Sequence, residues 1–325
     1  MSGQPLLEVR ELCKYFSTPG GKLHAVDGVD FAVGGGRTLG VVGESGCGKS
    51  TLGRTVLGLT PATSGRICFA GEDITDVRGR ERRRLQRQMQ IIFQDPSSSL
   101  NPRKTISQLI ADPLKVNRVC PDRAAMERRV RELMDVVGLA GRFAQSYPHE
   151  LDGGRRQRVG VARALALNPS FIVCDEPVSA LDVSIQAQIL NLLKQLQQQM
   201  GLTYLFITHD MSVVKHISHE IMVMYMGTMV EKCDARALFR EPLHPYTLGL
   251  LSAIPVPSIH HEKKRIVMQG EITSPINPKP GCRFAARCPQ ASERCRSQLP
   301  PLVEARPGHF VRCHKVGGAD APETA

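Results

Sequence analysis

The chain has 325 residues, of which 42% are hydrophobic and 22% charged, as expected for a globular protein with a sizeable core. Its formal net charge of +11 indicates an anionic partner (nucleotide, nucleic acid or acidic lipid) or a solvated basic surface. No run of about 18 apolar residues and no secretory signal is present, so we expect a cytosolic chain of about two domains.

Predicted strands and helices alternate along the first 230 residues. Strands are expected at residues 6–12, 38–42, 171–174, 203–208 and 220–225, and helices at 50–59, 122–137 and 184–200. The last two helices carry apolar residues at spacings of three and four, the pattern of an amphipathic helix. The apolar stretch 221–230 is interrupted by Gly227 and is predicted to form buried strands around a turn. The alternation predicts an α/β fold with a largely parallel sheet.

A glycine-rich loop follows the strand predicted at 38–42 and precedes a helix. Residues 43–50 match the pattern G-x-x-x-x-G-K-[ST], a phosphate-binding loop. Its backbone N–H groups would face phosphates, and the next helix would direct its positive dipole end at them. Lys49 is expected to reach the β- and γ-phosphates and Ser50 to bind Mg²⁺. The predicted nucleotide-binding residues here are Gly43, Glu44, Ser45, Gly46, Cys47, Gly48, Lys49, Ser50 and Thr51.

Two carboxylates follow the buried strand predicted at 171–174. Ligands of open α/β sheets bind at the carboxyl ends of strands, where Asp175 and Glu176 emerge. Asp175 is expected to hold the Mg²⁺ shell, and Glu176 to orient or deprotonate an attacking water.

Five motifs in this order resemble those of ABC transporter ATPases. They are the loop at 43–50, Gln94, the pair Asp175-Glu176, the segment 179–182 and Thr208-His209-Asp210. The resemblance covers residues 6 to about 250. It implies a P-loop ABC ATPase with a RecA-like core, an antiparallel β subdomain and a helical subdomain at about 95–165, together a nucleotide-binding domain of residues 1–250.

The resemblance also assigns roles to single residues. Phe16 is similar to the aromatic residue that stacks on adenine, with Tyr15 as the alternative. Gln94 resembles the glutamine that contacts Mg²⁺ and links nucleotide state to the membrane subunits. Glu176 resembles the catalytic glutamate, and His209 the histidine that contacts the γ-phosphate. Asp182 resembles the aspartate that communicates across the ATPase dimer. The catalytic set is therefore Glu176, His209, Lys49 and Gln94, and the Mg²⁺ set Ser50, Gln94 and Asp175.

One motif departs from the family pattern. The family signature Leu-Ser-Gly-Gly-Gln, which faces the γ-phosphate held by the opposite subunit, is Leu151, Asp152, Gly153, Gly154 and Arg155 here. A carboxylate about 4 Å from a phosphate charge costs on the order of 4 kcal/mol at an effective dielectric of 20. Asp152 is nevertheless a good N-cap, and Arg155 could offset its charge. We hypothesise that the chain pairs with a second, non-identical ATPase subunit.

Four cysteines near the C-terminus have the spacing C-x5-C-x6-C-x17-C. Cys282, Cys288, Cys295 and Cys313 could bind Zn²⁺ or an iron–sulfur cluster through four thiolates, with His314 as a substitute ligand. Spacing alone does not decide between zinc, an iron–sulfur cluster and a chance cluster of unligated thiols, because neither the usual zinc pair nor the common ferredoxin pattern is present.

Residues 251–325, together with the preceding residues 244–247, resemble the C-terminal extension of oligopeptide and dipeptide permease ATPases, closest to the F-type subunits of dipeptide permeases. The matching residues include 244–247, Gly281 to Phe284 and Arg287 to Pro289. The resemblance implies a small irregular cysteine-rich extension with a [4Fe–4S] cluster, favoured over zinc.

The resemblance further implies a peptide importer at the cytoplasmic face of the bacterial inner membrane. The expected partners are two transmembrane permease subunits, the second ATPase and an extracytoplasmic peptide-binding protein. Nickel or glutathione importers of the same family, and a soluble ABC ATPase acting on DNA or ribosomes, are the alternatives. The arginine-rich segment 78–87 lacks interleaved aromatic residues, so we predict a solvated basic helix and no nucleic-acid partner.

Overall fold

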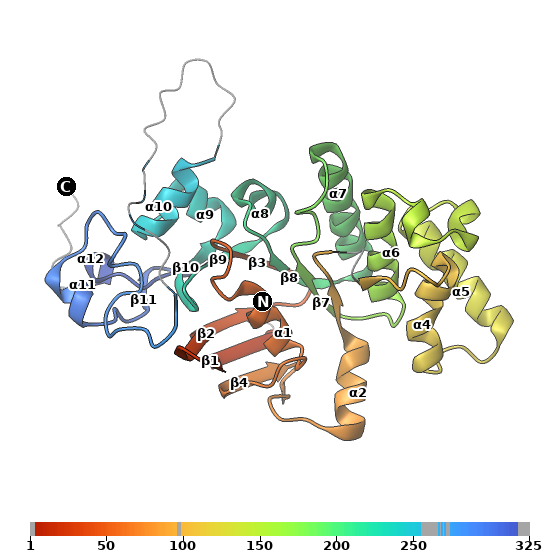
Figure 1. The fold of residues 1–325 in the computed structure, drawn as a ribbon, viewed down its shortest axis with the longest axis horizontal. Helices are drawn as coiled ribbons and strands as arrows, with labels where there is room; N and C mark the ends of the chain where they lie inside the picture. The colour runs from red at the N-terminus through yellow and green to blue at the C-terminus, as the bar shows by residue number, and fades with distance from the viewer. Residues whose placement is uncertain are drawn as a thin grey trace, which may run out of the picture. The chain divides into compact units, whose positions relative to one another are not determined.

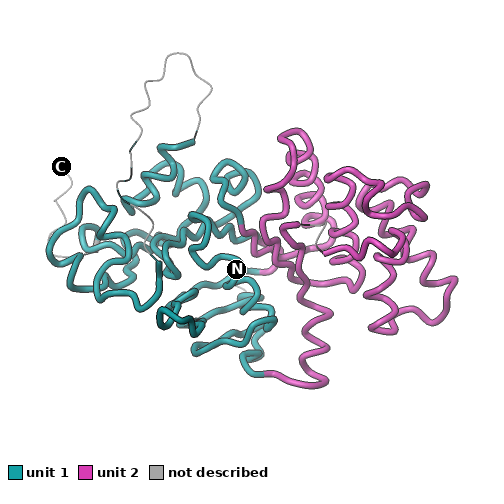
Figure 2. The backbone as a smooth tube through the Cα atoms, viewed as in Figure 1, with its two compact units in different colours: residues 1–34, 38–76, 208–325 teal, residues 35–37, 77–207 magenta. Residues whose placement is uncertain are grey.

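The computed structural model describes residues 4–95, 99–254, 266, 268, 270 and 274–317. The chain divides into two compact units (Figure 2). Unit 1 comprises residues 1–34, 38–76 and 208–325, and unit 2 comprises residues 35–37 and 77–207. The predicted helical segment 95–165 falls in unit 2 apart from residues 96–98, which lie outside the described residues. Of the predicted extension 251–325, residues 255–265, 267, 269, 271–273 and 318–325 also lie outside them.

An antiparallel sheet of four strands opens unit 1. It is formed by β1 (Leu7–Thr18), β2 (Gly21–Val33), β4 (Ser64–Phe69) and β5 (Glu72–Asp73), in the order β2-β1-β4-β5. The first strand was predicted only as 6–12. It continues to Thr18 because its exposed second half pairs with β2 as far as Thr18–Gly21, forming one long hairpin. Pairing with a neighbouring strand thus extends β1 beyond its apolar pattern.

The second sheet segment of unit 1 contains the first strand of the predicted α/β core. Its strands are β3 (Thr38–Val42), β9 (Glu220–Tyr225), β10 (Thr228–Asp234), β11 (Val303–Arg306) and β12 (His309–Val311), in the order β11-β12-β10-β9-β3. Only β3 and β9 pair in parallel within this segment. The helices of unit 1 are α1 (Lys49–Val56), α8 (Met211–Ile217), α9 (Ala235–Arg240), α10 (Pro245–Ser252), α11 (Glu293–Ser297) and α12 (His314–Gly317).

The region predicted to be irregular contains regular elements. Strands β11 and β12 and helices α11 and α12 have between three and five residues each. Segments of that length are shorter than the window in which a hydrophobic period can be recognised. The two buried strands predicted around Gly227 are confirmed as β9 and β10.

Unit 2 combines a parallel sheet segment with a group of helices. The strands are β6 (Met89–Ile92), β7 (Phe171–Asp175) and β8 (Thr203–Ile207), in the order β8-β7-β6, with both pairings parallel. Every residue of β7 and β8 is buried, as expected for a covered parallel sheet. The helices are α2 (Gly79–Gln88), α4 (Ile106–Val116), α5 (Arg123–Val136), α6 (Gly153–Leu165), α7 (Val183–Met200) and the short 3-10 helices η1 (Gly141–Gln145) and η2 (Pro148–Glu150). Helices α4, α5 and α6 gather in one group (Figure 1).

Local sequence signals account for these helix ends. Asp122 begins α5 by accepting a hydrogen bond from the Ala125 N–H group, and Gly201 ends α7 in the left-handed conformation that glycine favours. The predicted solvated basic helix is α2, in which only Leu85 is buried. Among the described residues, no helix is long and apolar enough to cross a membrane.

Candidate nucleotide site

The phosphate-binding loop lies between β3 and α1 in unit 1, the strand–loop–helix order that the motif requires. Two of its glycines are required by close backbone approach. Gly48 has φ of +102°, and a Cβ atom there would lie 1.9 Å from the Ala25 carbonyl oxygen. At Gly43 a Cβ would lie 2.2 Å from the Met224 carbonyl oxygen. Neither position accepts a side chain.

Lys49 is buried at the base of this loop. Its Nζ donates hydrogen bonds to the carbonyl oxygens of Gly43 (2.7 Å) and Glu44 (2.9 Å), and the residue is 4% exposed. The backbone of the phosphate-binding loop therefore holds the Lys49 ammonium group in place. Ser50 and Thr51 are half-buried in the first turn of α1, Ser45 and Gly46 are exposed, and Cys47 is buried.

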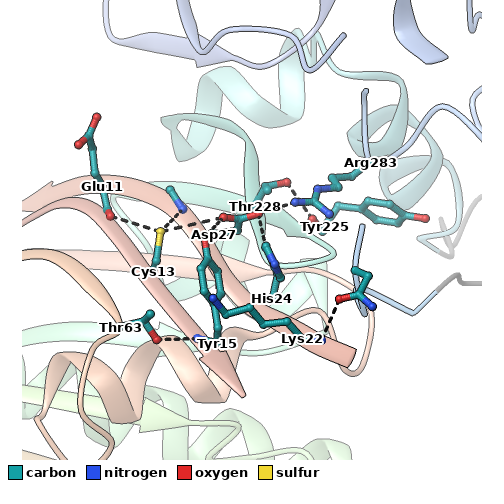
Figure 3. A network of polar contacts seen from close by, with 12 residues as sticks. Glu11, Cys13, Tyr15, Lys22, His24, Asp27, Thr63, Tyr225, Thr228 and Arg283 are labelled. Atoms are coloured by element: carbon teal, nitrogen blue, oxygen red, sulfur yellow. Dashed lines mark hydrogen bonds and ion pairs between the residues drawn. The ribbon is translucent and has the colours of Figure 1, made fainter. Parts of the chain in front are cut away.

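The structure distinguishes the two candidate adenine-stacking residues on β1. The Tyr15 ring stacks on His24 at a centroid distance of 4.0 Å, and its hydroxyl donates to the Asp27 carboxylate at 2.5 Å (Figure 3). Phe16, by contrast, is 37% exposed. Because Tyr15 is already packed and hydrogen-bonded, the geometry favours Phe16.

The segment carrying His209 lies beside β3. The Thr208 N–H group donates to the Val41 carbonyl at 3.1 Å, and Asp210 caps α8 by accepting from the N–H groups of Ser212 and Val213. His209 itself is exposed. These bonds hold the histidine segment against the strand that runs into the phosphate-binding loop.

In unit 2, the structure brings Gln94 and Glu176 into contact. Gln94 Nε2 donates to Glu176 Oε2 at 3.1 Å, although 82 residues separate them. Asp175 is 2% exposed at the end of β7, whereas the next residue, Glu176, has a φ of +46°. A positive φ at a non-glycine residue is uncommon and is concentrated at functional sites. The Glu176 N–H group, bonded to the Ile207 carbonyl at 2.9 Å, helps to hold it there.

The atypical signature segment starts α6. Asp152 accepts a hydrogen bond from the Arg155 N–H group at 2.8 Å, and its carboxylate forms an ion pair with the Arg155 side chain at 2.8 Å. The aspartate is therefore an N-cap with a partly compensated charge. Gly154 is buried against α7, where an added Cβ would lie 2.6 Å from Ile185 Cγ2, and Gly153 lies beside Leu181. Asp182 precedes α7 without a side-chain cap bond.

All four C-terminal cysteines line one pocket in unit 1, together with His314. The Cys282 N–H group donates to the Cys295 carbonyl at 2.8 Å, which joins the segment around Cys282 to α11. Burial raises the pKa of Cys282 to about 11 and also raises the pKa values of Cys288 and Cys313. Within the described part of the chain, no group of three or more His, Cys, Asp or Glu side chains is placed to hold a metal ion.

Two residues that contact the phosphate-binding loop, Tyr246 and Arg287, were given no role in the site by the sequence patterns. Glu44 donates its N–H group to the buried Tyr246 hydroxyl (2.9 Å), and its carboxylate accepts two hydrogen bonds from Arg287. Both partners lie in segments that match the permease ATPases, but a match of types does not indicate a contact.

Comparisons with known proteins show the family of the chain. Residues 26–179 match the family model described as ABC transporter, and residues 230–295 the model described as oligopeptide/dipeptide transporter, C-terminal region. A putative oligopeptide transport ATP-binding protein, YkfD, of Bacillus subtilis is 49% identical over 324 residues, covering 98% of both chains. The oligopeptide transport ATP-binding protein AppF of the same organism is 49% identical, covering 96% of this chain and 97% of its own.

Solved structures show the same fold. The ATP-binding cassette MJ0796, solved as a dimer in a post-hydrolysis state with ADP and Pi, superposes with a TM-score of 0.65 at 28% identity. The match covers 71% of this chain and 99% of the MJ0796 chain. The cbiO1 protein of Clostridium perfringens, part of a cbiONQ transporter complex, gives a TM-score of 0.65 at 26% identity, covering 74% and 92%.

Proposed function

The chain belongs to the ABC transporter family as an ATP-binding subunit of the oligopeptide/dipeptide type, and we propose that its ATPase activity drives uptake of di- and oligopeptides across the bacterial inner membrane. The predicted family membership and the ABC ATPase fold are confirmed. The observation that carries the peptide cargo is the match of residues 230–295 to the C-terminal region of oligopeptide/dipeptide transporters, a segment beyond the ATPase motifs.

The proposed mechanism is positioning and charge stabilisation rather than covalent catalysis. Lys49 and His209 neutralise charge on the transferring phosphoryl group, and Phe16 stacks on adenine. Glu176 directs the attacking water, with its carboxylate oriented by the Gln94 amide at 3.1 Å. Mg²⁺ would be held by Ser50, Gln94 and Asp175 and would stabilise phosphate charge. Support for these roles is the order of the motifs and the burial of Lys49 and Asp175.

Steady-state ATP hydrolysis and binding of a non-hydrolysable ATP analogue test these roles. Glu176→Gln is expected to lower turnover at least about 100-fold while analogue binding remains, because the loss falls on the attacking water. Lys49→Ala should abolish binding. Equal turnover by the wild type and Glu176→Gln would refute the assignment of Glu176.

We further propose that the partner ATPase is a different subunit. Asp152 supports this, since a carboxylate replaces the serine of the family signature, and its hydrogen bond and ion pair with Arg155 only partly offset the charge. Asp152→Ser should raise turnover of the assembled complex, with the exposed Asp135→Ser on α5 as the matched control. An unchanged or lower rate for Asp152→Ser would contradict an impaired signature.

The four cysteines are proposed to hold a [4Fe–4S] cluster, with Zn²⁺ as the alternative. Support comes from the donor set alone, because four cysteine thiols, the usual ligands of iron–sulfur clusters, line one pocket. The cluster would supply a covalent cross-link of the extension. Broad visible absorbance that bleaches on iron chelation is expected of anaerobically purified protein. A colourless protein with one zinc per chain would favour the alternative, and metal-free protein would overturn both.

The remaining proposal concerns partners and location. We propose peripheral attachment to the cytoplasmic face through two transmembrane permease subunits, in a complex with a peptide-binding protein. Affinity capture from detergent-solubilised native membranes should recover these subunits and the second ATPase. Capture with a nickel- or glutathione-binding protein would change the cargo, and capture of ribosomal or DNA-repair proteins alone would refute transport.

A further inference from the structure

Residues 275–277 lie against the hairpin that carries Phe16. The His24 N–H group donates to the Pro275 carbonyl at 3.0 Å, and the Asn277 N–H group donates to the Lys22 carbonyl at 2.9 Å. Between these bonds, Ile276 pairs with Leu23 in an antiparallel bridge. Leu23 is in turn the cross-strand partner of Phe16. Residues 275–277 are therefore attached to β2 of the hairpin by one antiparallel bridge and its flanking hydrogen bonds.

Arg283, six residues after Asn277 in the sequence, forms an ion pair with Asp27 (Figure 3). Asp27 also accepts hydrogen bonds from the Tyr15 hydroxyl (2.5 Å) and from His24 Nδ1 (3.0 Å). Burial opposes ionisation of Asp27, but the bonds from Tyr15 and His24 and the charge of Arg283 lower its pKa below the ordinary value. The Asp27 carboxylate is therefore a charged hub that joins Arg283 to the base of the adenine-binding hairpin.

Arg287 lies four residues further on and reaches the phosphate-binding loop. Its Nη1 donates to Glu44 Oε2 at 2.7 Å and its Nη2 to Glu44 Oε1 at 3.1 Å, a bidentate pair. The side chains of Arg287 and Glu44 are only 8% and 21% exposed, so solvent screens the pair weakly. The Tyr246 hydroxyl accepts from the Glu44 N–H group, so backbone and side chain of Glu44 are both held by residues from the C-terminal part of the chain.

Phe284 fixes the segment between the two arginines. It is 1% exposed, packs edge-on against Tyr225 at a centroid distance of 5.2 Å and lies tilted against Tyr246 at 5.4 Å. Tyr225 ends β9, the strand that pairs with β3 ahead of the phosphate-binding loop. The segment is thus anchored in the core, and the two arginines extend from one rigid base.

We propose that residues 275–287 form a clasp that determines nucleotide affinity by holding the adenine-binding hairpin through Arg283–Asp27 and the phosphate-binding loop through Arg287–Glu44. The proposal rests on the nucleotide site proposed above. Glu44 places a negative charge one residue into a loop that receives phosphates, and like charges at short range repel. Arg287 neutralises that charge and fixes the Glu44 side chain, while the Tyr246 hydroxyl holds the loop backbone. Because Arg283 follows Cys282 and Arg287 precedes Cys288, folding of the cysteine-rich extension and nucleotide binding are thermodynamically linked.

Calorimetric titration of the full chain with a non-hydrolysable ATP analogue tests the clasp. Arg287→Met should raise Kd about tenfold, which corresponds to about 1.4 kcal/mol. The matched control is Arg294→Met, an exposed arginine of α11 in the same extension, which should leave Kd unchanged. In a Glu44→Gln background, Arg287→Met should raise Kd less than about threefold, because no charge is left to neutralise. Wild-type affinity in Arg287→Met, or additive effects of the two substitutions, would overturn the proposal.

Linkage supplies a second readout that general destabilisation does not reproduce. If the clasp couples the sites, bound nucleotide must slow amide hydrogen exchange of residues 281–298 in the wild type and leave it unchanged in Arg287→Met. Equal protection in both would overturn the coupling. Arg287→Lys, which keeps the charge but not the bidentate geometry, should give an intermediate Kd and serves if the methionine variant unfolds.

The two proposals fail differently. A wild-type chain that does not bind the analogue, or that binds it as tightly as Lys49→Ala does, would overturn both the nucleotide site and the clasp. If the wild type binds, Lys49→Ala does not, and Arg287→Met equals the wild type, only the clasp is overturned.

Discussion

Glu231 on β10 offers the sharpest test of how the C-terminal part of unit 1 is held. The residue is fully buried, and its carboxylate accepts hydrogen bonds from the N–H groups of Leu243 (2.7 Å) and His244 (3.0 Å) and from His309 Nε2 (2.8 Å). One side chain therefore joins β10 to the start of α10 and to β12. Glu231→Leu leaves three donors without their acceptor: two are buried, and the Leu243 N–H group is half-buried.

The expected cost follows from this count of orphaned donors. Each unsatisfied buried donor costs about 1–3 kcal/mol, so the loss of the shared acceptor costs at least about 3 kcal/mol for the three donors together. We expect Glu231→Leu to lose about 3–5 kcal/mol, a large part of a typical stability of about 5–15 kcal/mol. Glu231→Gln keeps an acceptor oxygen and should lose about half as much.

Urea unfolding of the full chain measures this loss. The matched control is Glu127→Leu, which removes an exposed i,i+4 pair with Arg123 (2.8 Å) and should cost less than about 1 kcal/mol. A loss below about 1 kcal/mol for Glu231→Leu, with an unchanged slope of free energy against urea, would refute the proposal that Glu231 holds β10, α10 and β12 together.

Three further predictions concern pH and glycine. Burial lowers the pKa of His244 from 6.5 to about 4, so the folded chain binds fewer protons than the unfolded chain between these values. The resulting stability, about 3 kcal/mol, is complete above pH 6.5 and is lost as pH falls towards 4; His244→Asn, which keeps an acceptor for the Tyr246 N–H group, should flatten urea stability across that window. Gly154→Ala should destabilise by about 1–3 kcal/mol because its Cβ meets Ile185 at 2.6 Å. Gly160→Ala in the same helix meets no atom within 4 Å and should stabilise by about 0.5–1 kcal/mol; equal melting temperatures of the two variants would contradict both expectations. Gly48→Ala should abolish binding of the ATP analogue, since its Cβ would lie 1.9 Å from a backbone oxygen; micromolar binding would show that the loop can rearrange.

The nucleotide loop and the buried strands could be predicted from sequence because their signals are local. The pattern at residues 43–50 specifies both the turn and the phosphate chemistry, and the runs of four apolar residues within β7 and β8 indicate buried parallel strands. Helices α5 and α7 were predicted to within one residue at each end, because each carries an apolar stripe and a recognisable terminus. Strands β11 and β12 could not be predicted from sequence, because a strand of three or four residues is too short to show a hydrophobic period.

Contacts between distant segments were decided only by the tertiary structure. Arg283 pairs with Asp27 across 256 residues, and Arg287 pairs with Glu44 across 243. The chain contains 42 lysines and arginines and 31 aspartates and glutamates, so the sequence offers many oppositely charged combinations and no spacing rule that selects these two. Folding selects them, because β9, β10 and the aromatic core around Phe284 place the two arginines beside the β1–β2 hairpin and the phosphate-binding loop. Burial of the side chains then reduces solvent screening and strengthens each ion pair.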